Sequence, residues 1–188
     1  MKNNNCFWTL LEPIHGQAEG FCRRLAGNRD DGDDLYQDSL LTAINKFGSL
    51  RNEAAFRPWL FKVIINRFRN RSREAWWRRR ASLTTGVLEA NLISDPRDAN
   101  DAKRVLEIAM QVLSVQDKAL LMLFEFDQWT IAELAELHAR PEGTIKARLS
   151  RSRGKMRRFL EGRLKKIERQ TNTSEGEYGL QKGNATAE

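Results

Sequence analysis

A row of basic side chains near the end of the chain has the spacing of one helix face. Its members recur every three or four residues: Thr144, Arg148, Arg151, Lys155 and Arg158. No acidic residue interrupts the stretch from 144 to 158. Arg and Lys side chains in such a row bind nucleic-acid phosphates and donate hydrogen bonds to base edges in the major groove. The row therefore predicts a DNA-binding helix; the alternative is a solvated basic helix in an all-α bundle.

The residues before this row predict the first helix of a helix-turn-helix. Thr130 followed by Glu133 forms a capping box, which begins a helix. Pro141 is tolerated near a helix start, so the second helix begins close to it. The inner side of that second helix is predicted to be Ile145, Leu149, Ser152, Met156 and Phe159. A motif of this kind lays its second helix in the major groove.

Composition favours a polyanionic partner. The 188 residues carry a formal net charge of +7, which suits nucleic acid better than an anionic membrane surface here. No apolar run approaches the ~20 residues of a membrane span, so no membrane insertion is expected. The first residues do not have the pattern of a signal peptide. The expected location is the cytoplasm.

The residues that usually carry catalysis or bind metal are few. A zinc site from Cys6, His15 and Cys22 would have a spacing that fits no standard pattern, and Cys22 is predicted to pack in the core. The sequence has no Gly-rich phosphate loop and no nucleophile–base arrangement. We therefore expect no enzyme activity, no catalytic residue, no cofactor and no metal.

The N-terminal half is predicted to contain helices over 13–25, 34–47 and 54–73. Gly27 is expected to end the first of them. The second has a buried side and a separate polar stripe consisting of Asp34, Gln37, Asp38 and Leu41. This stripe is either a solvated face with one stray leucine or an acidic partner surface within a basic protein, and the residues alone do not separate the two.

The third predicted helix has one basic face, and aromatic residues alternate with basic ones along this part of the sequence. The face consists of Lys62, Asn66, Arg69, Asn70 and Arg73. The aromatic residues interleaved with the basic ones are Phe61, Phe68, Trp76 and Trp77. Arginines beside aromatic rings suit single-stranded nucleic acid, because bases stack on rings while phosphates meet the charges. The alternative for most of these rings is the protein core.

The pattern as a whole predicts an all-α protein of two small helical domains joined by a flexible linker. Periodicity is lost over 81–101, the predicted linker. The domains are predicted over 10–80 and 102–162. The second starts with a helix over 102–113 whose inner side includes Leu106. The polar segment 170–188 is predicted to be disordered.

Two stretches resemble bacterial RNA polymerase sigma factors of the extracytoplasmic-function (ECF) class. Residues 32–70 resemble region two through Asp-Asp-Leu at 33–35, Gln-Asp at 37–38, Phe-Arg-Pro-Trp-Leu at 56–60 and Asn66. Residues 113–158 are similar to region four through Ile-Ala-Glu at 131–133, Gly-Thr-Ile-Lys at 143–146 and the Arg-rich helix that follows. The two stretches have the family's order and spacing, and together they cover most of residues 10–160.

The resemblance implies a transcription initiation factor that binds core RNA polymerase and brings it to promoter DNA. It implies that Asp34, Gln37, Asp38 and Leu41 dock on the clamp helices of the polymerase. It also implies that the loop 47–53 captures a flipped base of the melted minus-ten element. The basic face of Lys62, Asn66, Arg69, Asn70 and Arg73 would bind the same strand.

The resemblance further implies that the helix-turn-helix reads the minus-thirty-five element as duplex. The residues nearest the bases would be Glu142, Thr144, Lys146, Ala147, Arg148 and Arg151. Those nearer the phosphates would be Arg140, Arg153 and Lys155. An anti-sigma factor is an expected partner. The alternatives are a stand-alone DNA-binding regulator, which would not need the polar stripe beside the basic helix, and an RNA-binding protein.

Overall fold

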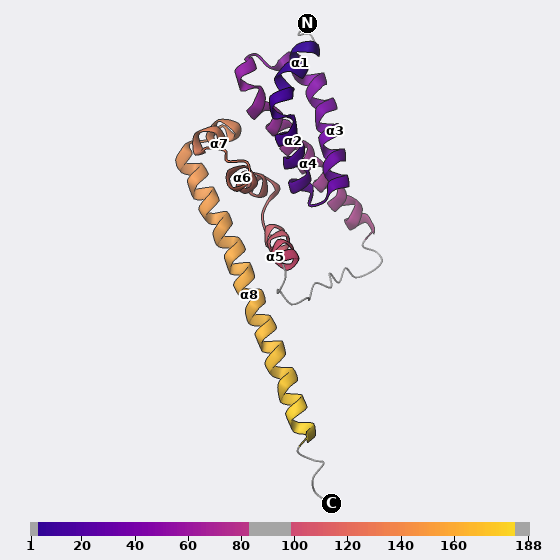
Figure 1. Cartoon of the computed structure of the whole chain (residues 1–188), viewed down its shortest axis with the longest axis vertical. Helices are drawn as coiled ribbons and strands as arrows, with labels where there is room; N and C mark the ends of the chain where they lie inside the picture. The colour runs from indigo at the N-terminus through magenta and orange to yellow at the C-terminus, as the bar shows by residue number, and fades with distance from the viewer. Residues whose placement is uncertain (1–3, 83–98, 183–188) are drawn as a thin grey trace, which may run out of the picture.

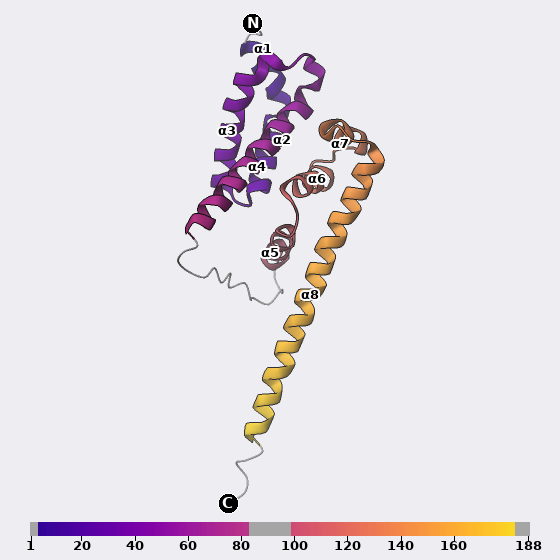
Figure 2. The same ribbon diagram turned by 180° about the vertical axis from the view of Figure 1, so that it is seen from behind.

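The computed structural model describes residues 4–82 and 99–182, with side chains described for 5–74 and 105–165. Every regular element in those ranges is a helix, as the sequence predicts. Four helices form the N-terminal half, followed by a second group of helices whose last member extends far beyond the rest (Figures 1 and 2). Most of the predicted linker lies outside the described residues.

The N-terminal half consists of α1 (Asn4–Leu11), α2 (His15–Ala26), α3 (Arg29–Lys46) and α4 (Phe56–Ser82). Helix α1 was not predicted from the sequence, yet Phe7 and Leu11 are buried. The Phe7 ring makes edge-to-face contacts with Phe47 and Phe56 at centroid distances of 5.3 and 5.4 Å. The core of this half therefore begins before residue 10, the predicted domain start.

Helices α2 and α3 begin and end where their local chemistry allows. Gly27 ends α2 in the left-handed conformation with φ 90°, as predicted. Helix α3 starts at Arg29 and not at 34, because the Asn28 side chain caps it by accepting from the backbone N–H of Asp31. Gly32 lies where α3 crosses α2: a Cβ there would come within 2.4 Å of the Arg23 Cα. The crossing therefore requires glycine at position 32.

Between α3 and α4 the chain makes two short 3₁₀ turns, Phe47–Ser49 and Glu53–Ala55. Asn52 caps the second by accepting from the Ala54 N–H, as the sequence indicates. Helix α4 then runs nine residues past the predicted end at 73, to Ser82. The structure decides between the two interpretations of its aromatic rings. Phe61 is buried and Phe68 is packed against the core, so neither is free to stack on a base. The Trp76 and Trp77 side chains lie outside the described residues.

The C-terminal half consists of α5 (Ala99–Met110), α6 (Val115–Glu125), α7 (Ile131–His138) and α8 (Glu142–Lys182). Leu106 was predicted to point inward but is 38% exposed, whereas Ala109, Met110 and Leu113 are buried. Ser114 caps α6 by accepting from the Asp117 N–H. Helix α8 continues to Lys182, and residues 183–188 of the segment predicted to be disordered lie outside the described residues.

The helix-turn-helix forms as predicted. Thr130 and Glu133 make both hydrogen bonds of the capping box at the start of α7. Ala139 ends α7 with φ 49°, a left-handed conformation that is uncommon without glycine. The inner residues of α8 that are buried are Ile145, Leu149, Ser152 and Met156. This packing leaves Thr144, Arg151 and Lys155 of the row exposed and Arg148 partly buried.

The two halves pack against each other through Trp129, in the loop between α6 and α7. Its side chain is 2% exposed although it lies in a loop. The ring lies 5.0 Å from that of Phe61 on α4, and the Arg57 guanidinium stacks over it at 4.1 Å. Gln128, with φ 55°, turns the chain just before it. A residue of the C-terminal half thus completes the core of the N-terminal half.

Candidate nucleic-acid and polymerase interfaces

The polar stripe of α3 faces outward. Leu41 is 63% exposed, and Asp34 and Gln37 are exposed as well. Asp38 makes an ion pair of 2.9 Å with Arg67 of α4, yet its side chain remains 42% exposed. An exposed leucine among carboxylates gives this face both an apolar anchor and negative charge, which suits a partner protein with a basic surface.

The basic face of α4 lies next to the helix-turn-helix. Lys62, Arg69 and Arg73 are exposed, while Asn66 and Asn70 are half-buried. Phe61 and Phe68 of the same helix pack into the core, on the side away from these charges. The loop 47–53 is less open than expected, because Phe47 and Leu50 are buried. Its exposed members include Gly48, Ser49 and Arg51.

On α8 the predicted DNA-reading residues divide into two groups. The exposed ones are Glu142, Thr144, Lys146, Ala147, Arg151, Arg153 and Lys155. Arg140, in the turn, is also exposed. Arg148 differs from them: its Nε and Nη2 donate to Asp117 Oδ1 of α6 at 3.0 and 2.7 Å, and its side chain is 19% exposed. This pair joins α8, the second helix of the helix-turn-helix, to α6.

The electrostatics of the Arg148–Asp117 pair favour its ionised form. Hydrogen bonds from Ser114 and Arg148 lower the pKa of the Asp117 carboxyl, overcoming the opposing effect of burial. Arg153 makes a similar but more exposed pair with Glu125, at 2.6 Å. Lys146 lies 3.8 Å from Glu142, one turn earlier on α8. Three cations that are predicted to bind DNA, Lys146, Arg148 and Arg153, thus each have a carboxylate partner within the chain.

Residues predicted for two different promoter elements meet in one cleft between the halves. The cleft has a volume of about 290 Å³, and its lining from α4 includes Lys62, Asn66 and Arg69. The opposite wall includes Arg140 and Arg148, with Gln116 and His138. Burial, followed by the charges of Arg148 and Lys62, lowers the pKa of His138 to about 4. Asn70 and Arg73, farther along α4, do not line this cleft, and neither do Arg151 and Lys155 on α8.

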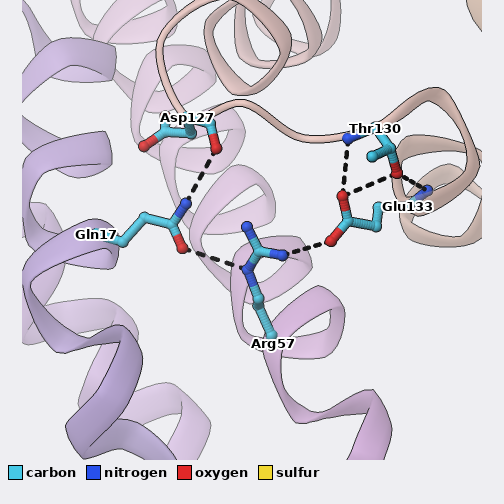
Figure 3. A network of polar contacts seen from close by, with 5 residues as sticks. All are labelled: Gln17, Arg57, Asp127, Thr130 and Glu133. Carbon is cyan, nitrogen blue, oxygen red and sulfur yellow. Dashed lines mark hydrogen bonds and ion pairs between the residues drawn. The ribbon is translucent and has the colours of Figure 1, made fainter.

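The contacts that join the halves involve residues that sequence reasoning did not single out for this role. Arg57 Nη1 donates to Glu133 Oε1 at 2.6 Å, while its Nε donates to Gln17 Oε1 at 3.3 Å. Gln17 in turn donates to the backbone carbonyl of Asp127 at 3.3 Å, so α2, α4 and α7 share one hydrogen-bond network (Figure 3). The sequence contains one signal of this junction: Trp129 follows Asp127-Gln128 and belongs to no periodic apolar stripe.

Two further ties lie beside this network. Arg24 of α2 pairs with Asp127 at 2.6 Å; the Asp127 side chain is 5% exposed, and burial raises the pKa of its carboxyl. Lys118 of α6 donates to the carbonyl of Leu25 at 2.8 Å, at the C-terminal end of α2, where the helix dipole favours a cation. Burial lowers the pKa of Lys118. These contacts extend the junction from α4 to α2.

Cys6, Cys22 and His15 do not form a metal site. Cys22 is buried, and burial raises the pKa of its thiol to about 12, in keeping with the predicted packing role. Cys6 donates to Glu53, and His15 Nδ1 lies 2.6 Å from the Tyr36 hydroxyl. Across the described residues there is no group of three or more His, Cys, Asp or Glu that could hold a metal ion. Among the same residues, no helix is long and apolar enough to cross a membrane.

The described residues combine an all-helical fold with an acidic outer stripe, a basic helix and a helix-turn-helix, an arrangement typical of nucleic-acid-binding proteins. Family models make the class specific. Residues 10–78 match Sigma-70 region 2, and residues 103–156 match Sigma-70, region 4. Among curated proteins, the chain is 27% identical over 154 residues to the ECF RNA polymerase sigma factor SigM of Mycobacterium tuberculosis, covering 82% of this chain and 76% of that one. It is 25% identical over 169 residues to SigW of Bacillus subtilis, covering 84% and 90%.

Solved structures share the fold. The sigma factor RpoE of Bartonella quintana, in complex with the anti-sigma factor NepR, has a TM-score of 0.62 and 22% identity, covering 82% of this chain and 96% of that one. CnrH, in complex with the cytosolic domain of CnrY, has a TM-score of 0.58 and 18% identity, covering 86% and 91%. The chain belongs to the ECF class of sigma factors. It is a promoter-specific transcription initiation factor, with the region that recognises the minus-ten element preceding the one that recognises the minus-thirty-five element.

Proposed function

We propose that the three surfaces described above divide the work of initiation. The α3 stripe of Asp34, Gln37, Asp38 and Leu41 docks on core RNA polymerase. The α4 face of Lys62, Asn66, Arg69, Asn70 and Arg73 binds the melted minus-ten strand. The observation that carries the proposal is the outward α3 stripe, with Leu41 63% exposed among acids, on the same domain as the basic α4 face. A simple DNA-binding regulator has no use for that combination.

The third surface is the helix-turn-helix. We assign base contacts to the exposed first turns of α8, around Glu142, Thr144 and Ala147, with Lys146 and Arg151 beside them. Arg140, Arg153 and Lys155 contact phosphates, which position the helix without reading sequence. Arg148 reaches the bases only by giving up part of its pair with Asp117. None of these roles requires a catalytic residue, a cofactor or a metal.

An anti-sigma factor is the proposed regulator. The similar sigma factors RpoE and CnrH were solved with the anti-sigma factor NepR and the cytosolic domain of CnrY. For this chain, a partner of that kind would act by covering the α3 stripe or the DNA-binding faces. The proposed place of action is the cytoplasm, where core polymerase and promoters are found.

The test is binding of the purified chain to core RNA polymerase, followed by initiation from a promoter library. Discrete start sites that share two upstream elements are expected. If the chain ignores core polymerase yet binds duplex DNA, it is instead a stand-alone regulator, and the α3 stripe has another use.

The charge reversal Asp38→Arg tests the docking stripe. It places a cation where a basic partner is proposed, so affinity for core polymerase should fall about tenfold, equivalent to ~1.4 kcal/mol. Asp30→Arg is the matched control, because Asp30 is an exposed acid of the same helix outside the stripe. Equal affinities of the two variants for core polymerase would remove the stripe from the proposal.

A further inference from the structure

Helix α1 presents a tryptophan side chain to solvent. Trp8 is 50% exposed, and its ring makes an edge-to-face contact with the Phe7 ring at a centroid distance of 5.3 Å. Phe7 is 1% exposed, and its own ring contacts those of Phe47 and Phe56. The exposed indole is therefore restrained by the buried phenylalanine beside it, so a partner that covers it pays little for ordering the side chain.

A groove lies beside Trp8, where α1 and α3 run next to each other (Figures 1 and 2). Its volume is about 440 Å³. One side comes from α1, the 3₁₀ turn Glu12–Ile14 and the first residue of α2, and the other side comes from α3. Its lining includes Trp8, Leu11, Glu12, His15, Tyr36 and Leu40. Leu11 and Tyr36 are buried and Leu40 is half-buried, so the floor of the groove is largely apolar.

His15 and Tyr36 form a fixed wall of the groove. His15 Nδ1 lies 2.6 Å from the Tyr36 hydroxyl, and the two rings stack at a centroid distance of 5.4 Å. Tyr36 is 5% exposed, so the hydrogen bond ties the exposed imidazole to a side chain of the core. The groove is therefore formed before any partner binds, as ligand sites usually are.

The groove borders the α3 stripe that is proposed to dock on core polymerase. Leu40 lines the groove, and Leu41, which is 63% exposed, is the next residue of α3. With 3.6 residues per turn, Gln37 lies between them, about 60° around the helix from Leu40 and about 40° from Leu41. A partner that covers Gln37 and Leu41 therefore reaches the groove without crossing another element.

The stripe by itself is too small for a stable protein interface. A specific interface takes about 800 Å² and roughly 20–30 residues from each partner. On one side of the stripe, Asp38 pairs with Arg67 of α4, the helix that bears the basic face proposed for DNA. On the other side lie the apolar groove and the exposed ring of Trp8. The polymerase contact therefore has its room to extend over α1.

The groove suits a basic side chain with an apolar stem. Glu12 is exposed and supplies a carboxylate to the lining. The stem of an arginine or lysine can pack on Leu40 while its charged head lies over the Trp8 ring and pairs with Glu12. The acidic residues of the stripe, Asp34 and Asp38, favour the same kind of partner surface.

We propose that the groove between α1 and α3 is a second contact site for core RNA polymerase, with Trp8 as its anchor and an arginine or lysine of the polymerase as its occupant. The inference rests on the proposed docking of the α3 stripe, which the groove continues. Aromatic anchors contribute a large share of the binding free energy at protein interfaces. Trp8 thus belongs to the docking surface although it lies outside the stripe.

The decisive variant is Trp8→Ala in the full chain, with Trp8→Phe as its matched control. The measurement is the Kd of the chain, labelled at its C-terminus, for purified core RNA polymerase by fluorescence anisotropy. Trp8→Ala is expected to raise this Kd at least about fivefold, whereas Trp8→Phe keeps a ring at the groove and stays within about twofold. The Kd for random duplex DNA is expected to stay unchanged in both, because α1 bears none of the proposed DNA-binding residues.

A charge reversal tests the nature of the occupant. Glu12→Arg places a cation where a basic side chain is proposed to bind, so the Kd for core polymerase is expected to rise about fivefold. Asp30→Arg is the control, since Asp30 is an exposed acid of α3 away from the groove and the net charge changes equally. The difference between the two variants is expected to shrink at high salt.

An unchanged Kd for core polymerase in Trp8→Ala, or equal Kd values for Glu12→Arg and Asp30→Arg, overturns the inference. Circular dichroism reports whether Trp8→Ala is folded; if it is not, the pair of charge variants decides. Weaker binding of an anti-sigma factor by Trp8→Ala, with core polymerase binding unaffected, would assign the groove to that regulator and would also overturn the inference.

The proposed function fails separately. If the wild-type chain does not bind core polymerase, the docking of the α3 stripe falls, whatever the groove variants show. If the wild-type chain binds and Asp38→Arg weakens binding while Trp8→Ala does not, the inference falls and the proposed function stands.

Discussion

The N-terminal half keeps its cluster of three phenylalanine rings to itself, whereas the C-terminal half depends on its neighbour to bury Trp129. In the first, Phe7 of α1, Phe47 after α3 and Phe56 at the start of α4 contact one another edge to face. In the second, the α6–α7 loop places its largest ring, Trp129, against α4. The α3 stripe therefore lies on the half whose phenylalanine cluster is internal, while the helix-turn-helix is joined to that half through Trp129.

Trp129→Ala should break this dependence. Removing a fully buried tryptophan costs ~3–5 kcal/mol, and here the loss falls on the junction. Amide hydrogen exchange is expected to show faster exchange in α6 and α7 with α2 and α3 little changed. Trp8→Ala is the control, because Trp8 is 50% exposed and its loss should change stability by less than ~0.5 kcal/mol. Equal loss of protection in both halves would mean that the N-terminal core also relies on the junction.

Arg148→Ala separates a structural role from a reading role within the C-terminal half. Loss of the pair leaves Asp117 without its cation, and loss of a base contact weakens promoter recognition by ~1–3 kcal/mol. Asp117→Asn frees Arg148 without removing it, so promoter affinity should be kept or raised. The measurement is the Kd for promoter and random duplexes in each variant. An equal loss on both duplexes in Arg148→Ala would leave Arg148 an electrostatic role alone.

Lowering the pH should loosen the junction through His138. Its charged neighbours are Lys62 of α4, across the cleft, together with Arg148 of α8 and Asp117 of α6 in its own half. The pKa is about 4 in the folded chain and 6.5 in the unfolded one, so the unfolded state binds the proton first and stability falls as the pH drops from 6.5 toward 4. Between pH 7.5 and 5 we expect a loss of about 1 kcal/mol, allowing for solvent screening.

Urea unfolding at the two pH values measures this loss, and His138→Gln is expected to abolish the part that His138 contributes. A pH dependence that is the same in the variant would exclude His138 as its source.

Ala139→Gly should give the smallest change, and a stabilising one. Ala139 ends α7 with φ 49°, where an L side chain is strained and glycine is not. The gain is offset by the greater freedom of glycine in the unfolded chain, so we expect about 0.5 kcal/mol or less, from thermal unfolding. Gly27→Ala in the N-terminal half is expected to have the opposite effect and lower the stability, because Gly27 has φ 90°. Destabilisation by Ala139→Gly would show that the turn needs more than backbone freedom.

Much of the fold could be read from local signals. The capping box at Thr130 and the glycine stop at Gly27 both formed where the sequence indicates, because each depends on neighbouring residues. Helix α1 was missed because it is short and has no long periodic stripe, and its Phe7 is buried against Phe47 and Phe56, which lie far along the chain. Leu106 followed the helical period yet lies 38% exposed, since periodicity cannot say whether a neighbour covers that face.

The candidate surfaces show the same division. The sequence by itself determined which residues share a helix face: the α3 stripe, the basic face of α4 and the outer row of α8 follow from the 3.6-residue period. Tertiary structure decided which faces meet. It paired Arg148 with Asp117, buried Trp129 on Phe61 and brought Lys62 opposite Arg140. Those contacts join residues tens of positions apart, and no local pattern specifies them because their energy comes from two surfaces closing on each other.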